Sequence, residues 1–201
     1  MNNKKQNNPH LRIVLYGSGG VGKSTILIRF LLGKFIQEYD PTIEESYRKE
    51  IELNDEKIIF EILDSAGCEE DSIIIKRCLK FSDFFVLVYS VDNKFSFKEI
   101  NYFHELIKRY LLEKNENKKD YPKILIGNKS DLFTKRRITC KQGKELAKKL
   151  NCKFIETSAK TGENVHQLFY ESIILAIQDL EKNPNKYQNK YHKKKGKCLL
   201  M

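Results

Sequence analysis

Short hydrophobic runs along the chain alternate with stretches whose hydrophobic residues recur at helical spacing. The runs predict strands over residues 11–16, 47–53, 57–63, 84–91, 123–127 and 153–156. The helical spacing predicts helices over residues 24–32, 96–111, 142–150 and 165–180. Strands that alternate with helices are typical of a parallel sheet covered on both faces. The short connection at 54–56 makes 47–63 a hairpin, which adds an antiparallel edge strand to that sheet.

The helix expected after the run at 84–91 carries a start signal. Ser96 is followed three residues later by Glu99, the spacing of a capping box in which each side chain accepts a backbone N–H at the helix start. We therefore expect the helix to begin at Ser96. Its hydrophobic face is formed by Phe97, Ile100, Phe103, Ile107, Tyr110 and Leu111.

Composition indicates one globular domain with terminal extensions. The 201 residues suit one domain, and 40% of them are hydrophobic, enough for a core. No hydrophobic run approaches the roughly 18 residues of a membrane span. Five irregularly spaced cysteines without a CxxC pair favour a reducing compartment over a disulfide framework or a zinc site. We expect a flexible N-terminus at 1–10 without a signal peptide, a domain at 11–182 and a flexible lysine-rich tail at 183–201.

Positive charge is concentrated near the C-terminus. The chain has 37 Lys and Arg against 27 Asp and Glu, a net charge of +10, and from Lys182 onward there are seven lysines and no acid. A nearly neutral domain with a basic appendage indicates an anionic partner. Charge alone leaves two partners open, nucleic acid and an anionic membrane surface.

A glycine-rich loop lies between the first predicted strand and the first predicted helix. Its residues fit the pattern G-x-x-x-x-G-K-[ST] and are Gly17, Ser18, Gly19, Gly20, Val21, Gly22, Lys23 and Ser24. In such a loop the backbone N–H groups point at phosphate oxygens, and the helix N-terminus adds partial positive charge. The lysine would neutralise the β- and γ-phosphates, and the serine hydroxyl would ligate Mg²⁺. The alternative is that these residues form a glycine-rich turn with a solvated lysine. The loop also does not indicate which base the nucleotide carries.

Two segments that follow predicted strands are candidates for reading the base. Asn128-Lys129-Ser130-Asp131 follows the strand at 123–127, and Glu156-Thr157-Ser158-Ala159-Lys160 follows the strand at 153–156. Ligands of open α/β sheets lie beyond the carboxyl ends of strands, so both segments should lie near the glycine-rich loop. The Asp131 carboxylate can accept two hydrogen bonds from guanine, whereas adenine would leave it unpaired. Backbone N–H groups at 158–160 could also reach the base. Taken alone, the segment 128–131 could be an ordinary polar turn.

With these motifs in order, the chain resembles the Ras family of small GTPases from Leu11 to Lys182 and again over its last four residues. The motifs that carry the resemblance are residues 17–24, 39–49, 64–67, 128–131 and 156–160. The resemblance implies a P-loop α/β fold with a six-stranded, mostly parallel sheet, one antiparallel edge strand and about five helices. It also implies binding of GTP or GDP with Mg²⁺, slow GTP hydrolysis and two nucleotide-sensing switches. A P-loop kinase or ATPase is disfavoured because the Asn128–Asp131 segment selects guanine.

The resemblance also assigns residues to roles. It places nucleotide contacts at residues 17–24 and at Thr25, Phe35, Thr42, Asp64, Ser65, Ala66, Gly67, Asn128, Lys129, Asp131, Ser158, Ala159 and Lys160. The Mg²⁺ site would be formed by Ser24, Thr42 and Asp64. The effector-binding segment would be Tyr39, Asp40, Pro41, Thr42, Ile43, Glu44, Glu45, Ser46 and Tyr47, with glutamate at 45 where Ras usually has aspartate. Effectors, exchange factors and GTPase-activating proteins are the implied partners.

One departure from the family pattern falls among the implied catalytic residues, Lys23, Gly67 and Cys68. Ras has a glutamine where this chain has Cys68, and that glutamine orients the attacking water. A thiol is shorter and is only a weak donor and acceptor. We therefore expect very slow hydrolysis, and the alternative is a largely GTP-locked effector-binding module. Rap-like relatives also lack the glutamine and use activators that supply their own catalytic residue, so GTP loading in cells stays open. Ser18 and Ser65 resemble variants found across Ras and Rap relatives, so the subfamily stays open as well.

The last four residues, Cys198-Leu-Leu-Met201, form a C-terminal CaaX box, in which a terminal Met favours farnesylation of the cysteine. A single prenyl chain anchors only marginally, so a second signal is needed. The tail has no other cysteine, and its lysines would supply the second signal at about 1 kcal/mol each near an anionic leaflet. We expect modification by a prenyltransferase and a location on the cytoplasmic face of the plasma membrane or of another membrane. Nothing in the sequence supports nucleic acid as the partner of these lysines.

Overall fold

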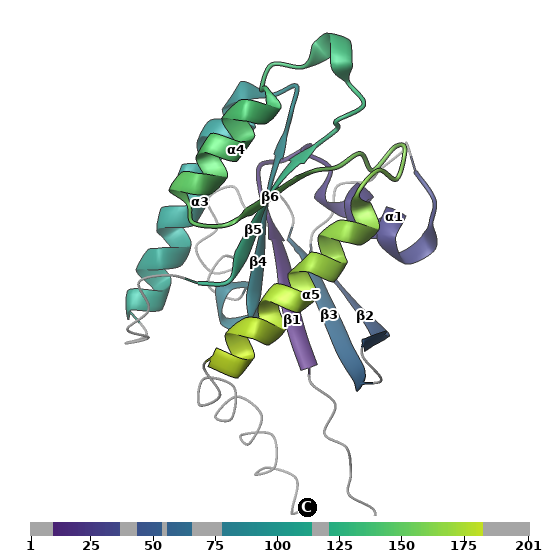
Figure 1. The fold of residues 1–201 in the computed structure, drawn as a ribbon, viewed down its shortest axis with the longest axis vertical. Helices are drawn as coiled ribbons and strands as arrows, with labels where there is room; N and C mark the ends of the chain where they lie inside the picture. The colour runs from purple at the N-terminus through teal and green to yellow at the C-terminus, as the bar shows by residue number, and fades with distance from the viewer. Residues whose placement is uncertain (1–9, 37–43, 54–55, 66–77, 114–120, 183–201) are drawn as a thin grey trace, which may run out of the picture.

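The computed structural model describes residues 10–36, 44–53, 56–65, 78–113 and 121–182. They form a six-stranded sheet with the order β2-β3-β1-β4-β5-β6 (Figure 1). The strands are β1 (His10–Tyr16), β2 (Glu44–Leu53), β3 (Glu56–Ser65), β4 (Phe84–Ser90), β5 (Lys123–Asn128) and β6 (Lys153–Glu156). β2 pairs antiparallel with β3, and every other pairing is parallel. The predicted α/β class, with one antiparallel strand at the edge, is confirmed.

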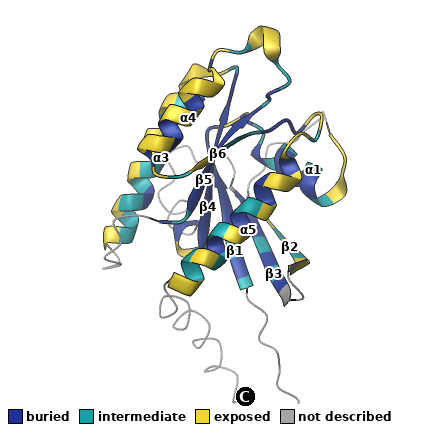
Figure 2. Ribbon diagram, viewed as in Figure 1, coloured by how far each residue is buried: buried dark blue, intermediate teal, exposed yellow. Residues whose placement is uncertain are grey.

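Helices cover both faces of the sheet, as Figure 1 shows. The helices α1 (Lys23–Leu32) and α5 (Val165–Lys182) pack on one face. The helices α3 (Lys94–Glu113) and α4 (Cys140–Lys149) pack on the other face, together with a helical turn at 78–81. The central strands β1, β4 and β5 are almost wholly buried, the edge strands β2 and β6 are partly exposed, and the outward faces of the helices are exposed (Figure 2). Strands buried on both faces explain the nearly continuous hydrophobic runs of β4 and β5.

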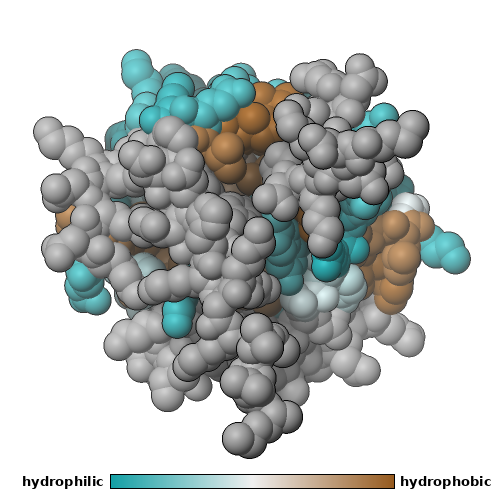
Figure 3. All heavy atoms as spheres, turned by 90° about the horizontal axis from the view of Figure 1, so that it is seen from below, coloured by the Kyte–Doolittle hydropathy of each residue, from teal (hydrophilic) through white to brown (hydrophobic). Residues whose placement is uncertain are grey.

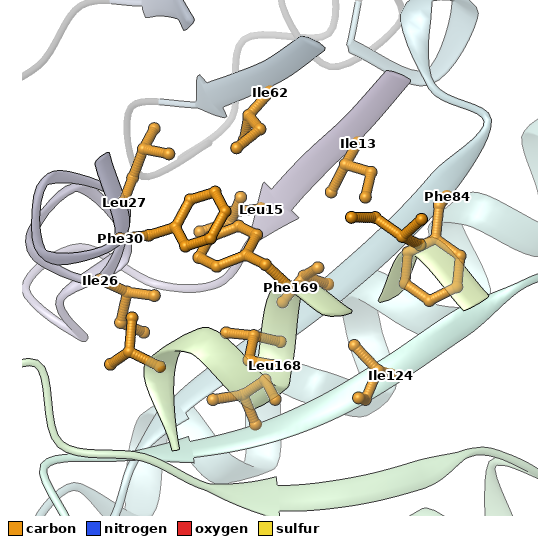
Figure 4. Packing of buried hydrophobic residues seen from close by; sticks show 14 of the residues in the cluster. Ile13, Leu15, Ile26, Leu27, Phe30, Ile62, Phe84, Ile124, Leu168 and Phe169 are labelled. Atoms are coloured by element: carbon orange, nitrogen blue, oxygen red, sulfur yellow. The ribbon is translucent and has the colours of Figure 1, made fainter. Parts of the chain in front are cut away.

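Aromatic packing fixes α1 against α5 and the sheet. The rings of Phe30 and Phe169 stack with their centroids 4.0 Å apart, and the edge of Phe60 lies against Phe169. Figure 4 shows Phe30 and Phe169 facing each other above the β-strand residues of this core. Full burial of such a side chain contributes about 1.5–3 kcal/mol. This packing holds α1, whose first residues follow the glycine-rich loop, in a fixed position on the sheet.

The prediction that a capping box opens α3 at Ser96 is wrong. The helix begins at Lys94, and the Oδ1 atom of Asn93 accepts the backbone N–H groups of Phe95 and Ser96. Ser96 is buried, and its hydroxyl accepts the N–H of Ser90 and donates to the carbonyl of Asn93. Asn93 therefore caps the helix three residues earlier than predicted, and Glu99 is not used at the helix start.

Other boundaries differ by a few residues. β2 begins at Glu44 rather than at residue 47, because its ladder with β3 continues to the pair Glu44–Ser65. α4 begins at Cys140 rather than at 142, where Thr139 and Gln142 form a capping box that the hydrophobic pattern did not reveal. α5 ends at Lys182 rather than at 180. The strand predicted at 153–156 has the predicted bounds.

The end of the sheet from which β5 and β6 start carries a shallow cavity of about 440 Å³. It is lined by Tyr121, Pro122, Lys123, Asn151, Cys152, Lys153, Leu175, Gln178, Asp179 and Lys182. Viewed from below, the described residues show hydrophobic patches separated by hydrophilic side chains (Figure 3). Among the described residues, no helix is both long and apolar enough to cross a bilayer. The predicted segment 183–201 and residues 1–9 lie outside the described residues.

Candidate functional site

The glycine-rich loop between β1 and α1 is shaped by two glycines that have no room for a side chain. A Cβ atom at Gly17 would lie 2.1 Å from the backbone oxygen of Val88 on β4. Gly22 has φ 93° and ψ 31°, in the left-handed region, and a Cβ there would lie 2.5 Å from the amide nitrogen of Asn128. The loop therefore curls tightly over the carboxyl ends of β1 and β4, and only glycine fits at these two positions.

Lys23 holds the two ends of this loop together. Its ammonium group donates to the carbonyl oxygens of Gly17 at 2.7 Å and Ser18 at 3.0 Å. The lysine is only 6% exposed, so its charge is fixed inside the concave side of the loop. A desolvated ammonium at the N-terminus of a helix is a strong anion-binding arrangement. This geometry is suited to a polyphosphate.

An acidic residue that the sequence assigned to a helix start contacts the loop instead. The Ser18 hydroxyl donates a hydrogen bond to Oε2 of Glu99, in the second turn of α3. Ser18 is buried and Glu99 is half-buried. The contact joins residues 81 positions apart, so no local pattern in the sequence could have revealed it. Glu99 is thus a side chain of the site that sequence reasoning missed.

Asn128 at the end of β5 connects three segments of the site. Its amide nitrogen donates to the carbonyl of Val21 at 2.9 Å. Its amide oxygen accepts from the Thr157 hydroxyl at 3.1 Å and from the backbone N–H of Ala159 at 3.4 Å. The side chain is 1% exposed. One buried amide therefore ties the glycine-rich loop to the loop that follows β6.

The two residues that flank Ser130 also reach across the site. Lys129 has φ 66°, and its ammonium donates to the carbonyl of Gly20 at 2.8 Å. The Ser158 hydroxyl donates to Oδ1 of Asp131 at 2.6 Å and accepts the N–H of Thr161 at 3.1 Å. The Asp131 carboxylate is therefore held in a fixed orientation by the loop after β6. A fixed carboxylate is suited to a ligand with two adjacent donors.

The loop after β6 is held from its other side by an arginine. The Arg136 guanidinium donates to both oxygens of Glu156, at 2.6 Å and 3.0 Å. This hydrogen-bonded pairing raises the pKa of Arg136. Glu156 in turn lies at the end of β6, and its carbonyl accepts from the Asn164 amide at 2.8 Å. Arg136 is a second supporting residue that sequence reasoning missed.

Two described oxygen donors fit a magnesium ion. Asp64 lies near the carboxyl end of β3, pairs in register with Leu15 of β1, and is only 2% exposed. Ser24 follows Lys23 in the first turn of α1. Carboxylate and hydroxyl oxygens are ligands that Mg²⁺ prefers, and it keeps several of its ligands as water and substrate phosphate. Among the described residues, no three or more His, Cys, Asp and Glu side chains form a group that could hold a metal ion. A magnesium ion here would therefore take further ligands from water and phosphate.

Other predicted site residues are described in part or not at all. Phe35 follows α1 and is 39% exposed, Ser46 is exposed, and Tyr47 is half-buried against the α1–α5 core. The backbone of Glu44 and Glu45 lies in β2 and that of Ser65 in β3, and the side chains of these three residues are not among those described. Outside the described residues lie Tyr39, Asp40, Pro41, Thr42, Ile43, Ala66, Gly67, Cys68 and Cys198.

Comparisons with known proteins agree with this geometry. Residues 12–178 match the sequence model of the Ras family. The chain is similar to Ras-like protein rasS of Dictyostelium discoideum, with 41% identity over 197 residues, which covers 96% of this chain and 99% of that protein. The match includes the glycine-rich loop, both segments that approach it from β5 and β6, and the strands between them.

Proposed function

Because the chain belongs to the Ras family of small GTPases, we propose that it is a membrane-anchored GDP/GTP switch that binds effectors in its GTP state and hydrolyses GTP very slowly. Members of the family bind guanine nucleotide with Mg²⁺ and hydrolyse GTP. The observation that carries the proposal is the buried Asn128 side chain, which joins the glycine-rich loop to the loop after β6. This link brings a phosphate site and a base site to one edge of the sheet.

We propose the following division of roles at the nucleotide. Lys23 neutralises the β- and γ-phosphates, and Ser24 and Asp64 hold Mg²⁺, Asp64 through a bound water. Asp131 accepts the two donors on the guanine edge. The bound Mg²⁺ supplies charge neutralisation on the phosphates.

Fluorescent GDP tests these roles directly. With Mg²⁺ present, unlabelled GDP and GTP should displace it and ATP should compete poorly. Asp131→Asn turns an acceptor into a partial donor and should shift selectivity from guanine toward xanthine. Glu163→Gln is the matched control and should keep guanine selectivity, because Glu163 lies on the loop after β6 and accepts the Ser130 hydroxyl rather than facing the base donors. If Asp131→Asn kept full preference for guanine, the assignment of the base would be wrong.

The slow hydrolysis is proposed from Cys68, which replaces the glutamine that positions water in Ras. We expect hydrolysis at or below about 3–5 × 10⁻⁴ s⁻¹, the unaided rate of Ras, with little response to activators that depend on the glutamine. Single-turnover hydrolysis of the protein and of Cys68→Gln, with and without a Ras-type activator, tests this. Equal rates for the two proteins in both conditions would refute a role for residue 68.

The same residue supports a second candidate function, a GTP-locked effector-binding module with negligible turnover. The two functions differ in the nucleotide found on protein isolated from cells. The switch carries a mixture of GDP and GTP that changes with stimulation, whereas the locked module carries GTP throughout. In both, effectors bind the segment 39–47, part of which is β2 at the sheet edge. Retention of a Ras-binding domain by the GTP form alone, lost in Asp40→Ala, is the expected result.

Membrane anchoring is proposed from Cys198 and the lysines before it. Cys198→Ser removes the thiol that prenylation requires and should release the protein from membranes. Replacing Lys193–Lys195 with glutamine should weaken binding of the prenylated protein to anionic vesicles, because part of the electrostatic attraction is lost. Unchanged membrane association of Cys198→Ser would overturn the lipid anchor.

A further inference from the structure

The side chain of Arg29, in the last turn of α1, forms two hydrogen bonds that lead to different parts of the fold. One guanidinium nitrogen donates to the carbonyl of Gly33 at 2.9 Å, and the other donates to the carbonyl of Thr161 at 2.9 Å. The first contact is an ordinary way to satisfy the end of a helix. The second joins residues 132 positions apart and is not explained by helix capping. In Figure 1 the loop before α5 passes beside α1.

The chain around Gly162 leaves space for this guanidinium. Gly162 has φ 88°, and a Cβ atom built on it would lie 2.8 Å and 2.9 Å from two guanidinium nitrogens of Arg29. Any other residue at this position would displace the arginine or be strained in the left-handed region. The Arg29 guanidinium therefore occupies the space that a side chain at residue 162 would fill.

Both carbonyls that Arg29 holds belong to segments that flank the proposed base site. Gly33 ends α1 in the left-handed conformation, with its own N–H bonded to the carbonyl of Arg29. Phe35 follows two positions later, where the resemblance to the Ras family implies an aromatic ring stacked on the base. Thr161 follows the segment in which Ser158 holds Asp131 and Ala159 reaches Asn128. Arg29 is thus a bridge between the aromatic side and the carboxylate side of that site.

We propose that Arg29 is a positioning residue that sets how long guanine nucleotide stays bound. The inference rests on the proposed nucleotide site. The bridge ties the segment before Phe35 to the segment after Ser158, so its loss should let the two sides of the proposed base site separate more readily. Arg29 touches only backbone carbonyls among these contacts, so it influences the rate of release and not the choice of base. Arg29 lies outside the two nucleotide-sensing switches that the family resemblance implies, one at Thr42 and one at residues 64–67, so GDP and GTP should be affected equally.

Release rates of fluorescent GDP and of a fluorescent non-hydrolysable GTP analogue test the proposal. In the full chain with Mg²⁺, Arg29→Gln should accelerate release of both nucleotides by about 3- to 10-fold, the effect of losing one or two partly solvated hydrogen bonds. Arg29→Lys, which keeps the charge but reaches one carbonyl at a time, should give a smaller acceleration. Arg109→Gln, an exposed arginine on α3, is the control and should release both nucleotides at the original rate.

Two further readouts separate positioning from a general loss of stability. Preference for guanine over xanthine should be unchanged in Arg29→Gln, and single-turnover hydrolysis of bound GTP should keep its original rate. Release at the original rate in both Arg29 variants would overturn this inference and leave the proposed function intact. Acceleration accompanied by altered base selectivity, or confined to one nucleotide, would also overturn it. An unmodified protein that fails to hold GDP would overturn the proposed function, and this inference with it.

Discussion

Replacement of Asn128 by alanine tests the connection on which the site depends. The substitution removes the donor to the Val21 carbonyl and the acceptor for the Thr157 hydroxyl, both at ordinary hydrogen-bond distances, and a weaker contact with the Ala159 N–H at 3.4 Å. At about 1 kcal/mol for each of the two good bonds, the loss is about 2 kcal/mol. Because the side chain is 1% exposed, its former partners are left without ready access to water, which raises the loss to about 3 kcal/mol.

That loss has a kinetic consequence if the bonds hold the nucleotide loops in their bound arrangement. About 2–3 kcal/mol corresponds to roughly 30- to 150-fold faster release of GDP, since 1.4 kcal/mol is a factor of ten. The assay is displacement of fluorescent GDP from the full chain with Mg²⁺, together with urea unfolding at saturating GDP. Asn101→Ala, on the exposed surface of α3, is the matched control and should change neither measurement.

A double-mutant cycle with Thr157→Val isolates one of these bonds. The valine keeps the shape of threonine and removes only its hydroxyl, so the free energies of the two single variants and the double variant give the coupling between the side chains. We expect a coupling of about 0.5–1.5 kcal/mol. Additive effects of the two substitutions would show that Asn128 and Thr157 do not interact and would refute the argument for the link.

Four further substitutions have expected effects on the free energy of unfolding of the GDP-bound protein in urea. Tyr89→Phe should raise it by about 1 kcal/mol, because the buried hydroxyl of Tyr89 has no hydrogen-bond partner among the described residues. Asp83→Ala should lower it by about 3–5 kcal/mol, since it leaves Arg12, now bonded to both carboxylate oxygens at 2.9 Å and 3.0 Å, without that partner. Ser18→Ala should lower it by about 1 kcal/mol and Glu99→Gln by less, because glutamine keeps an acceptor for the serine hydroxyl.

Glu105→Ala is the common control for these four measurements. Glu105 pairs with Lys108 on α3 and its side chain is 62% exposed, so its removal should change stability by less than about 0.5 kcal/mol. A loss of stability in Tyr89→Phe would show that the hydroxyl is hydrogen-bonded after all. A loss below about 1 kcal/mol in Asp83→Ala would contradict a buried ion pair. Equal losses in Ser18→Ala and Glu99→Gln would contradict the role of an acceptor at residue 99.

The sequence predicted the strands, helices and loop whose residue pattern is set by their own local geometry and burial. Strands buried on both faces, such as β4, must be hydrophobic at almost every position, and helices packed on a sheet must be hydrophobic at helical spacing. The glycine-rich loop is likewise a local pattern, because Gly17 and Gly22 are required by backbone geometry at those positions. Thr42 and Cys68 are named by resemblance alone, since no described geometry bears on them.

The errors arose at two kinds of position. At one, two residues could each cap the same helix; at the other, hydrogen bonds to the neighbouring strand extend a strand beyond its hydrophobic pattern. Asn93 and Ser96 are both good helix caps, and only the structure shows that Asn93 accepts the N–H groups while Ser96 is buried below them. No alternation of hydrophobic and polar residues marks the start of β2 at Glu44. The neighbouring strand supplies its hydrogen bonds, so the ladder extends through polar residues.

Glu99 and Arg29 lie on the polar faces of helices, which a hydrophobic pattern assigns to solvent, yet both contact the site. Topology explains why. β4 lies next to β1 in the sheet and runs parallel to it, so α3, which follows β4, must begin beside the loop that follows β1. A polar side chain in the first two turns of α3 that faces β1 therefore meets that loop, and Glu99 does so through Ser18. Once strand order is known, the polar residues nearest the carboxyl edge of the sheet become the next candidates for site residues. By the same reasoning, the last turn of α1 is the place to look for contacts with the loop after β6, because α1 and α5 pack against each other on one face of the sheet.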